Sequence, residues 1–214
     1  DNIFKFERRD ESIIHNDTQR SVFGTVYSQF AKLDLDIRKY FNFNDGKQTL
    51  ILRQFIGIGL PYGNSKNMPF ARAYYNGGSN DIRAWKAYGG LGPSDSQLNE
   101  NIRTYMMGNM KLTTNIEYRF MMNNMFHGAL FTDLGNTWSI GEEKNDNAFK
   151  INKFYKQMGI GSGFGIRMNI AYVTFRLDFA YKVYDPNKPE GQKWVASKIN
   201  LLDPTVNFAI GYPF

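Results

Sequence analysis

The chain has 214 residues, with 26 Lys and Arg against 20 Asp and Glu, which leaves a formal net charge of +6. Its mean hydropathy is −0.47, and no run of about 18 or more apolar residues occurs, which excludes a transmembrane helix. The basic residues are scattered among acidic ones rather than clustered in a stripe, so no nucleic-acid partner is expected.

Apolar and polar side chains alternate with a period of two residues along much of the chain, which predicts antiparallel β-strands. In chain order, seven strands are expected over Tyr27–Phe41, Thr49–Leu60, Lys111–Phe120, Phe126–Trp138, Gln157–Met168, Ala171–Tyr184 and Thr205–Phe214. In the sixth of these, Leu177 and Phe179 share one face while Arg176 and Asp178 share the other. A strand needs about 9–11 residues to cross a bilayer, and these runs reach that length. The pattern therefore favours an all-β fold, a transmembrane antiparallel β-barrel, over a soluble sandwich.

The connections between the expected strands alternate between short and long. The short ones are Asn44–Lys47, Met121–Met125 and Met168–Ile170. The long ones are Pro61–Met110, Ser139–Tyr155 and Asp185–Pro204. Short periplasmic turns and long external loops are typical of barrels in the outer membrane of Gram-negative bacteria, so we expect that location.

Seven is an odd number of strands, whereas bacterial single-chain barrels normally have an even number. An unpaired strand edge in lipid would leave backbone groups without hydrogen-bond partners. We therefore expect this chain to be the C-terminal part of a larger barrel protein, whose N-terminal remainder supplies the other strands. Residues 1–23 would end an external loop, and residues 24–214 would form the barrel portion, with an inserted loop over about 61–110.

The fifth and seventh strands carry special residues. In the fifth, glycine occupies every second position from Gly159 to Gly165 on the expected lumen side, which allows either a close approach of another backbone or a bend of the sheet. In the seventh, Pro213 cannot donate a backbone hydrogen bond, so pairing near the end of the strand should be incomplete. The apolar stripe of the seventh strand would comprise Val206, Phe208, Ile210, Tyr212 and Phe214.

Several stretches resemble motifs of the BamA/TamA superfamily of outer-membrane assembly barrels, in that family's order. Tyr74–Pro93 (YYNGGSNDIRAWKAYGGLGP) lies in the longest loop and is similar to the family's sixth external loop, where an aliphatic residue precedes Arg-Gly and an aromatic residue. Three later motifs of the family resemble stretches that follow in this chain. They are Asn115–Phe120 (NIEYRF), Phe131–Trp138 (FTDLGNTW) and the terminal FAIGYPF. The GGSNDIRAW and LGP variants look most like the TamA-like, lipid-anchored branch.

The resemblance implies a 16-strand barrel in which the loop arginine, Arg83, docks on Glu117 and Asp133 inside the lumen. A guanidinium can satisfy two carboxylates through its fork of donors. The other residues of the loop motif are Gly77, Gly78, Ile82, Ala84 and Trp85. Ala84 stands where most members have glycine, so the backbone freedom of glycine is not needed at that point.

The resemblance also implies an assembly factor that inserts or translocates proteins at the outer membrane. Its seam, closed by the C-terminal strand with Phe208, Ile210, Gly211, Tyr212, Pro213 and Phe214, would open and pair with incoming strands. The expected partners are client outer-membrane or surface proteins, outer-membrane lipids and lipopolysaccharide, with a periplasm-spanning protein as a further candidate.

Other classes of function are weighed on the same residues. A secretion pore of the same superfamily, exporting one dedicated partner, shares all these features, whereas a passive porin does not require Arg83, Glu117 and Asp133. An enzyme is not expected, because the two histidines, His15 and His127, have no evident Ser or Asp constellation around them. No metal-ligand spacing, phosphate loop or dinucleotide motif occurs, so no metal or cofactor is expected.

Overall fold

The computed structural model describes residues 7–8, 20–22, 25–65, 67–92, 107–140 and 148–214. Most of the segment expected as the end of an external loop, residues 1–23, therefore lies outside the described residues, as does part of the long inserted loop. Three short strands, β1 (Glu7–Arg8), β2 (Arg20–Val22) and β3 (Thr25–Val26), form a small antiparallel sheet.

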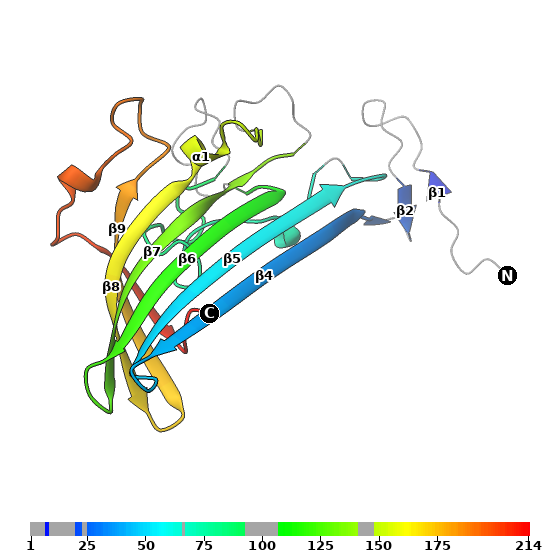
Figure 1. The fold of residues 1–214 in the computed structure, drawn as a ribbon. Coiled ribbons are helices and arrows are strands. Elements are labelled where there is room, and N and C mark those ends of the chain that lie inside the picture. Colours follow the sequence, from blue (N-terminus) through cyan, green and yellow to red (C-terminus); the bar gives the residue numbers. More distant parts are fainter. Residues whose placement is uncertain (1–6, 9–19, 23–24, 66, 93–106, 141–147) are drawn as a thin grey trace.

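The rest of the chain is built on one curved seven-stranded antiparallel sheet with the order β10-β9-β8-β7-β6-β5-β4 (Figure 1). Its strands are β4 (Phe30–Phe43), β5 (Gln48–Pro61), β6 (Met110–Met121), β7 (Phe126–Trp138), β8 (Gly159–Ile170), β9 (Val173–Tyr184) and β10 (Thr205–Ile210). Each strand pairs with its neighbours in sequence, so the sheet is a meander. The expected all-β antiparallel fold is confirmed; the total of 16 strands stays a prediction.

The helical elements of the described residues are short. They are η1 (Phe70–Arg72), α1 (Phe154–Gln157) and η3 (Ala196–Lys198). Within the described part of the chain, none of the helices is long and apolar enough to span a membrane.

The three short turns are tight, and one of them lies later than expected. At the first, Asn44 and Asp45 take left-handed φ angles of 52° and 53°, which these side chains tolerate. The expected turn at Met168–Ile170 is wrong: β8 continues to Ile170, which pairs with Val173, and the turn lies at Ala171–Tyr172. The backbone N–H of Asn169 donates to the Met125 carbonyl at 2.8 Å, which extends the ladder beyond the expected end of the strand.

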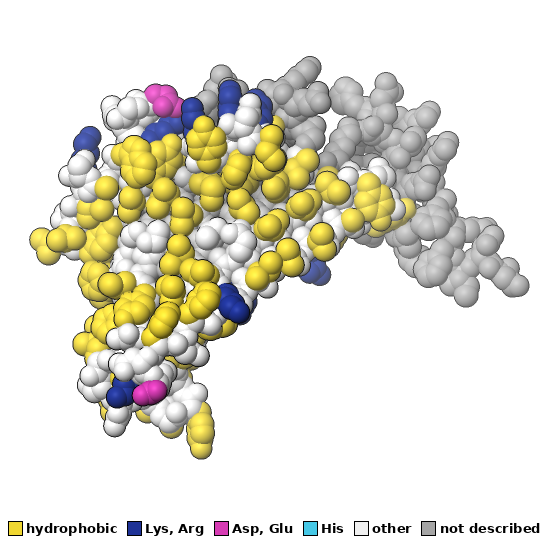
Figure 2. Space-filling view, in the orientation of Figure 1, with side chains coloured by type: hydrophobic (Ala, Val, Ile, Leu, Met, Phe, Trp, Pro, Cys, Tyr) yellow, Lys and Arg dark blue, Asp and Glu magenta, His cyan; other side chains and the backbone are white. Residues whose placement is uncertain are grey.

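The two faces of the sheet differ in chemistry. The outer face carries a broad belt of apolar side chains with charged groups gathered above and below it (Figure 2). Leu33, Leu130 and Phe208 on this face are 70%, 55% and 66% exposed. The concave face is polar and covered by part of the long loop, and the apolar core lies between loop and sheet. This core comprises Ile82, Ala84, Trp85, Leu91, Phe131 and Ala180.

The end of the chain leaves the sheet earlier than expected. Strand β10 ends at Ile210, not at Phe214, because Gly211 takes a φ of +87° and turns the backbone after its N–H donates to the Thr174 carbonyl. Phe214 is therefore buried, although alternation placed it on the outer stripe. Its ring centroid lies 5.6 Å from the guanidinium carbon of Arg53, whose side chain faces the lumen. The terminal residues Tyr212, Pro213 and Phe214 do not extend the closing strand.

Candidate functional site

The loop that covers the concave face is shaped by a tight turn at Gly77 and Gly78. Both take positive φ angles, 93° and 97°, which side chains disfavour. The N–H of Gly77 donates to the Asp81 carboxylate at 2.8 Å, and the N–H of Gly78 donates to the Trp85 carbonyl at 2.8 Å. The turn thereby folds the chain back on itself and presents the segment Ile82–Trp85 to the sheet.

Arg83 lies at the centre of the site and is fully buried. Its Nε and Nη2 donate to the two oxygens of Asp133 on β7, both at 2.8 Å, and its backbone N–H donates to the same carboxylate at 3.0 Å. Its Nη1 donates to Glu117 on β6 at 2.6 Å. The guanidinium carbon lies 3.5 Å from the centroid of the Phe131 ring. The structure thus brings together the three residues Arg83, Glu117 and Asp133.

Further charged residues surround the contacts of Arg83 with Glu117 and Asp133. The sequence analysis did not assign these residues to the site. Asp178 on β9 lies 3.6 Å from Nη1 of Arg83 and accepts a hydrogen bond from Arg167 on β8 at 2.6 Å. Arg167 also donates to Glu117 at 3.1 Å. Asp178 and Arg167 could have been predicted as site residues from their positions on the lumen-facing side of their strands.

Two further arginines complete the network. Arg119 donates to Glu117 at 2.7 Å, and Nε of Arg176 lies 3.2 Å from Asp178. Arg176 also donates to the loop, to the Ser79 carbonyl at 3.0 Å and the Asn80 side chain at 2.8 Å. Ionised groups are costly to bury unless they are paired. The network therefore depends on loop and wall being together, since each supplies partners for the other.

Neutral side chains from two strands hold the loop backbone. Asn115 on β6 donates to the Asp81 carbonyl at 2.9 Å and to Asp133 at 2.8 Å. Asn207 on β10 donates to the carbonyl of Arg83 at 2.9 Å, and Thr205 donates to the carbonyl of Ala84 at 3.2 Å. The closing strand is thus bonded directly to the loop.

The apolar side of the loop packs on the glycines of β8. A Cβ added at Gly161 would lie 2.5 Å from the Cβ of Ala84, and one added at Gly159 would lie 2.9 Å from Leu91 and 3.0 Å from Trp85. Atoms cannot approach so closely, so these glycines make room for the loop. Ala84 has no positive φ angle, and its methyl group occupies space that a side chain at position 161 would need.

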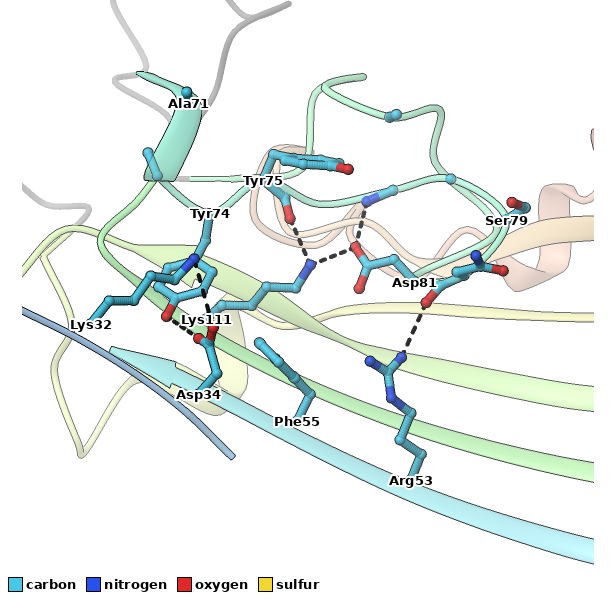
Figure 3. Close-up of a pocket in the computed structure, with 15 residues that line it drawn as sticks. Lys32, Asp34, Arg53, Phe55, Ala71, Tyr74, Tyr75, Ser79, Asp81 and Lys111 are labelled. Carbon is cyan, nitrogen blue, oxygen red and sulfur yellow. Dashed lines mark hydrogen bonds and ion pairs between the residues drawn. The ribbon is translucent and has the colours of Figure 1, made fainter. Parts of the chain in front are cut away.

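A cavity of about 520 Å³ separates the loop from β4 and β5 (Figure 3). Lys111 spans its inner side, donating to the Tyr75 carbonyl at 2.6 Å and pairing with Asp81 at 2.9 Å. Tyr74 donates from its hydroxyl to Asp34 on β4, and burial together with this hydrogen bond raises the pKa of Tyr74. The loop is therefore bonded to β4 as well as to β6, β7, β9 and β10.

The described residues offer no catalytic constellation of the kinds considered. They contain no group of three or more His, Asp or Glu that could hold a metal ion. His127 lies at the start of β7, where its Nδ1 is 3.2 Å from the Asn169 side chain, and His15 lies outside the described residues. The buried charges are used to bind the loop.

A curved meander with an apolar outer face, and with its own loop bonded into the polar concave face, defines part of a transmembrane β-barrel with an occupied lumen. The model of the Omp85 superfamily domain matches residues 16–214, and the chain belongs to that superfamily. This confirms the resemblance at the level of the superfamily; the TamA-like branch stays a prediction. Members of the superfamily are non-enzymatic outer-membrane assembly or transport proteins, which agrees with the expectation that no enzyme is present.

One solved structure with a similar fold is BamA from Haemophilus ducreyi lacking POTRA domains 1–3, with a TM-score of 0.60 and 14% sequence identity. The match covers 89% of this chain and 36% of that one, so the chain spans about a third of the length of that structure. Comparison with curated proteins gives no match.

Proposed function

We propose that the protein resides in the outer membrane of a Gram-negative bacterium and there inserts or translocates other proteins. The observation that carries the proposal is the buried Arg83, bonded to Glu117 and Asp133 on two strands of an Omp85 barrel wall. The loop lies across the lumen side of the wall, which argues against a passive porin.

Arg83 acts in this proposal as a clamp that keeps the loop inside the barrel. The side chain is held by three hydrogen bonds to carboxylates and lies on an aromatic ring, and it is closed off from solvent. Such charge-assisted, bidentate contacts fix geometry as well as adding stability. Releasing the loop would expose several buried charges at once, so a clamped loop and a closed wall support one another.

The closing strand supplies the proposed route for clients. Strand β10 has only six residues, and its pairing within the described residues is with β9 alone. An exposed strand edge can accept another strand through backbone hydrogen bonds. We infer that the edge of β10 pairs with the first strand of the barrel in the N-terminal remainder and can exchange that partner for a client strand.

The proposed partners follow from these surfaces. Outer-membrane lipids and lipopolysaccharide would contact the apolar belt and the external loops, and client outer-membrane or surface proteins would meet the seam. A periplasm-spanning protein is a further candidate partner on the side of the short turns.

The test is depletion of the complete protein in its native bacterium, followed by quantification of every other outer-membrane protein in the membrane fraction. Broad or selective loss of other barrels or surface proteins supports an assembly or translocation factor. Loss of a single secreted partner with an otherwise unchanged membrane points instead to a dedicated secretion pore. No change in any other protein contradicts the proposal and favours a channel.

A further inference from the structure

The turn over residues 200–203, in the connection between β9 and β10, has two leucines at its tip. Leu201 and Leu202 are 72% and 92% exposed. Asn200 holds the turn: its carbonyl accepts from the N–H of Asp203 at 3.1 Å, and its side chain accepts from the N–H of Leu202 at 3.0 Å. Exposed turn tips normally carry polar or small residues. Two adjacent leucines in a well-bonded tip indicate that apolar surroundings cover them.

The turn lies on the outer side of the barrel wall. Tyr181 belongs to the outward-facing set of β9, and its hydroxyl donates to the Leu201 carbonyl at 2.9 Å. Strand β10 begins a few residues later at Thr205, opposite Ala180. Figure 1 shows this connection projecting sideways from the sheet rather than over the lumen. The two leucines are therefore continuous with the apolar outer belt.

The residues around the turn have the chemistry of a membrane interface. Trp194 is 65% exposed and packs edge to face on Tyr184, with 5.1 Å between the ring centroids. Lys198 in η3, four residues later in the chain, is also exposed. Tryptophan and tyrosine favour the headgroup level of a bilayer, and lysine is attracted to anionic headgroups. Leucines at the tip of such a segment would lie deeper, among the acyl chains.

We propose that the turn over residues 200–203 inserts Leu201 and Leu202 into the acyl region of the outer leaflet. It forms a lipid anchor at the external end of the closing strand. The inference rests on the proposed location in the outer membrane. Lipid is the occupant because the turn continues the outer belt and because the exposed Trp194 and Lys198 precede it in the same connection. The anchor holds the first residues of β10 against the membrane, independently of the bonds that tie Thr205 and Asn207 to the loop.

Trp194 provides an intrinsic fluorescent probe for this turn. The chain has three tryptophans, of which Trp85 and Trp138 are buried and only Trp194 is exposed. The full protein is reconstituted in phosphatidylcholine vesicles with or without bromine on the acyl chains, and Trp194→Phe gives the background. We expect brominated lipid to quench the Trp194 emission and soluble iodide to leave it largely unquenched. The double variant L201D/L202D should lose most of this quenching and shift the emission to the red.

Two controls make the result decisive. The first control is Ile151→Asp. Ile151 is an apolar residue that is also highly exposed, at 80%, but it lies in the connection between β7 and β8. This substitution should leave the Trp194 signal unchanged. Phe208→Trp in the Trp194→Phe background places a probe on the outer belt, and its quenching shows that the barrel itself is embedded. If that probe is quenched and Trp194 is not, the anchor is wrong while the membrane location stands. Trp194 protected from both quenchers indicates that another part of this protein, or a second copy of it, covers the residue, and likewise overturns the anchor.

Discussion

Two regions of the same sheet, the lumen wall formed by β6 to β9 and the edge strand β4, show what the loop contributes. Along the wall, Glu117, Asp133 and Asp178 are fully buried and paired. Along β4, every residue from Ala31 to Phe43 is exposed, and its ion pairs, such as Asp36 with Arg38, remain open to solvent. The alternation of side chains is the same in both regions. The loop and the neighbouring strands together, rather than the strand pattern, turn surface charges into a buried network, since β4 has a neighbour on one side only among the described residues.

The largest expected effect comes from reversing the clamp. Arg83→Glu places a third carboxylate against Glu117 and Asp133, and breaking a buried ion pair costs about 3–5 kcal/mol. We expect a loss of at least that size in the free energy of unfolding of the reconstituted protein, measured with guanidinium. Arg38→Glu on β4 is the matched control and should change stability by less than about 1 kcal/mol, because its pair is exposed.

A double-mutant cycle tests directly whether Arg83 interacts with the carboxylates of the wall. Asp133→Arg combined with Arg83→Glu should recover part of the loss, because opposite charges again face each other. Asp133 is the partner to reverse, since Glu117 also binds Arg119 and Arg167. Strictly additive losses would contradict the docking of Arg83 on Asp133.

The next effect tests the packing of the loop on the glycine strand. Gly161→Ala puts a methyl group against that of Ala84, and overpacking of this kind costs about 1–3 kcal/mol. Adding Ala84→Gly should recover most of the loss, although Ala84→Gly alone should be mildly destabilising. The measurement is the unfolding free energy together with protease sensitivity of the loop. Failure of the second change to rescue the first would contradict the close approach.

The C-terminal residue gives an effect of similar size. Phe214→Ala removes a buried ring that lies beside Arg53 and Arg83, and burial of such a side chain contributes about 1.5–3 kcal/mol. Phe208→Ala on the outer face of β10 is the comparison, and it should have the smaller effect on unfolding in detergent. Equal effects of the two substitutions would mean that the inward turn at Gly211 does not secure the chain end.

The smallest effect concerns the contact between the loop and the edge strand. Tyr74→Phe removes the hydrogen bond to Asp34 and should cost about 1 kcal/mol. Because the folded state raises the pKa of Tyr74, its contribution is complete below the ordinary tyrosine pKa of about 10 and is lost as the pH rises above it. Unfolding measured across that range should show a steeper alkaline decline in the wild type than in Tyr74→Phe. If the stability of the two proteins declined in parallel with pH, the raised pKa of Tyr74 would be contradicted.

Several features of the fold and site could be read from local pattern. The strand positions, the polar side chains on the lumen face and the glycine row of β8 all follow from periodicity. The pairing expected for Arg83 came from family resemblance, and no spacing of residues could have shown it. Asp178 and Arg167 were seen as lumen-facing but not as members of the site, because their contacts depend on how β8 and β9 are placed against the loop. Gly165 lies opposite Asp178, where a side chain would overlap the Asp178 carboxylate and Arg167.

The sequence by itself determined which side chains belong to which face of the sheet, because successive residues of a strand point in opposite directions whatever surrounds them. It also indicated that pairing would fail near Pro213. Only the tertiary structure decided that Phe214 turns into the lumen and that Ala84 takes the space above Gly161. It likewise decided that four arginines and three carboxylates share one buried network. Those outcomes depend on contacts between segments far apart in the chain, and local alternation carries no information about such contacts.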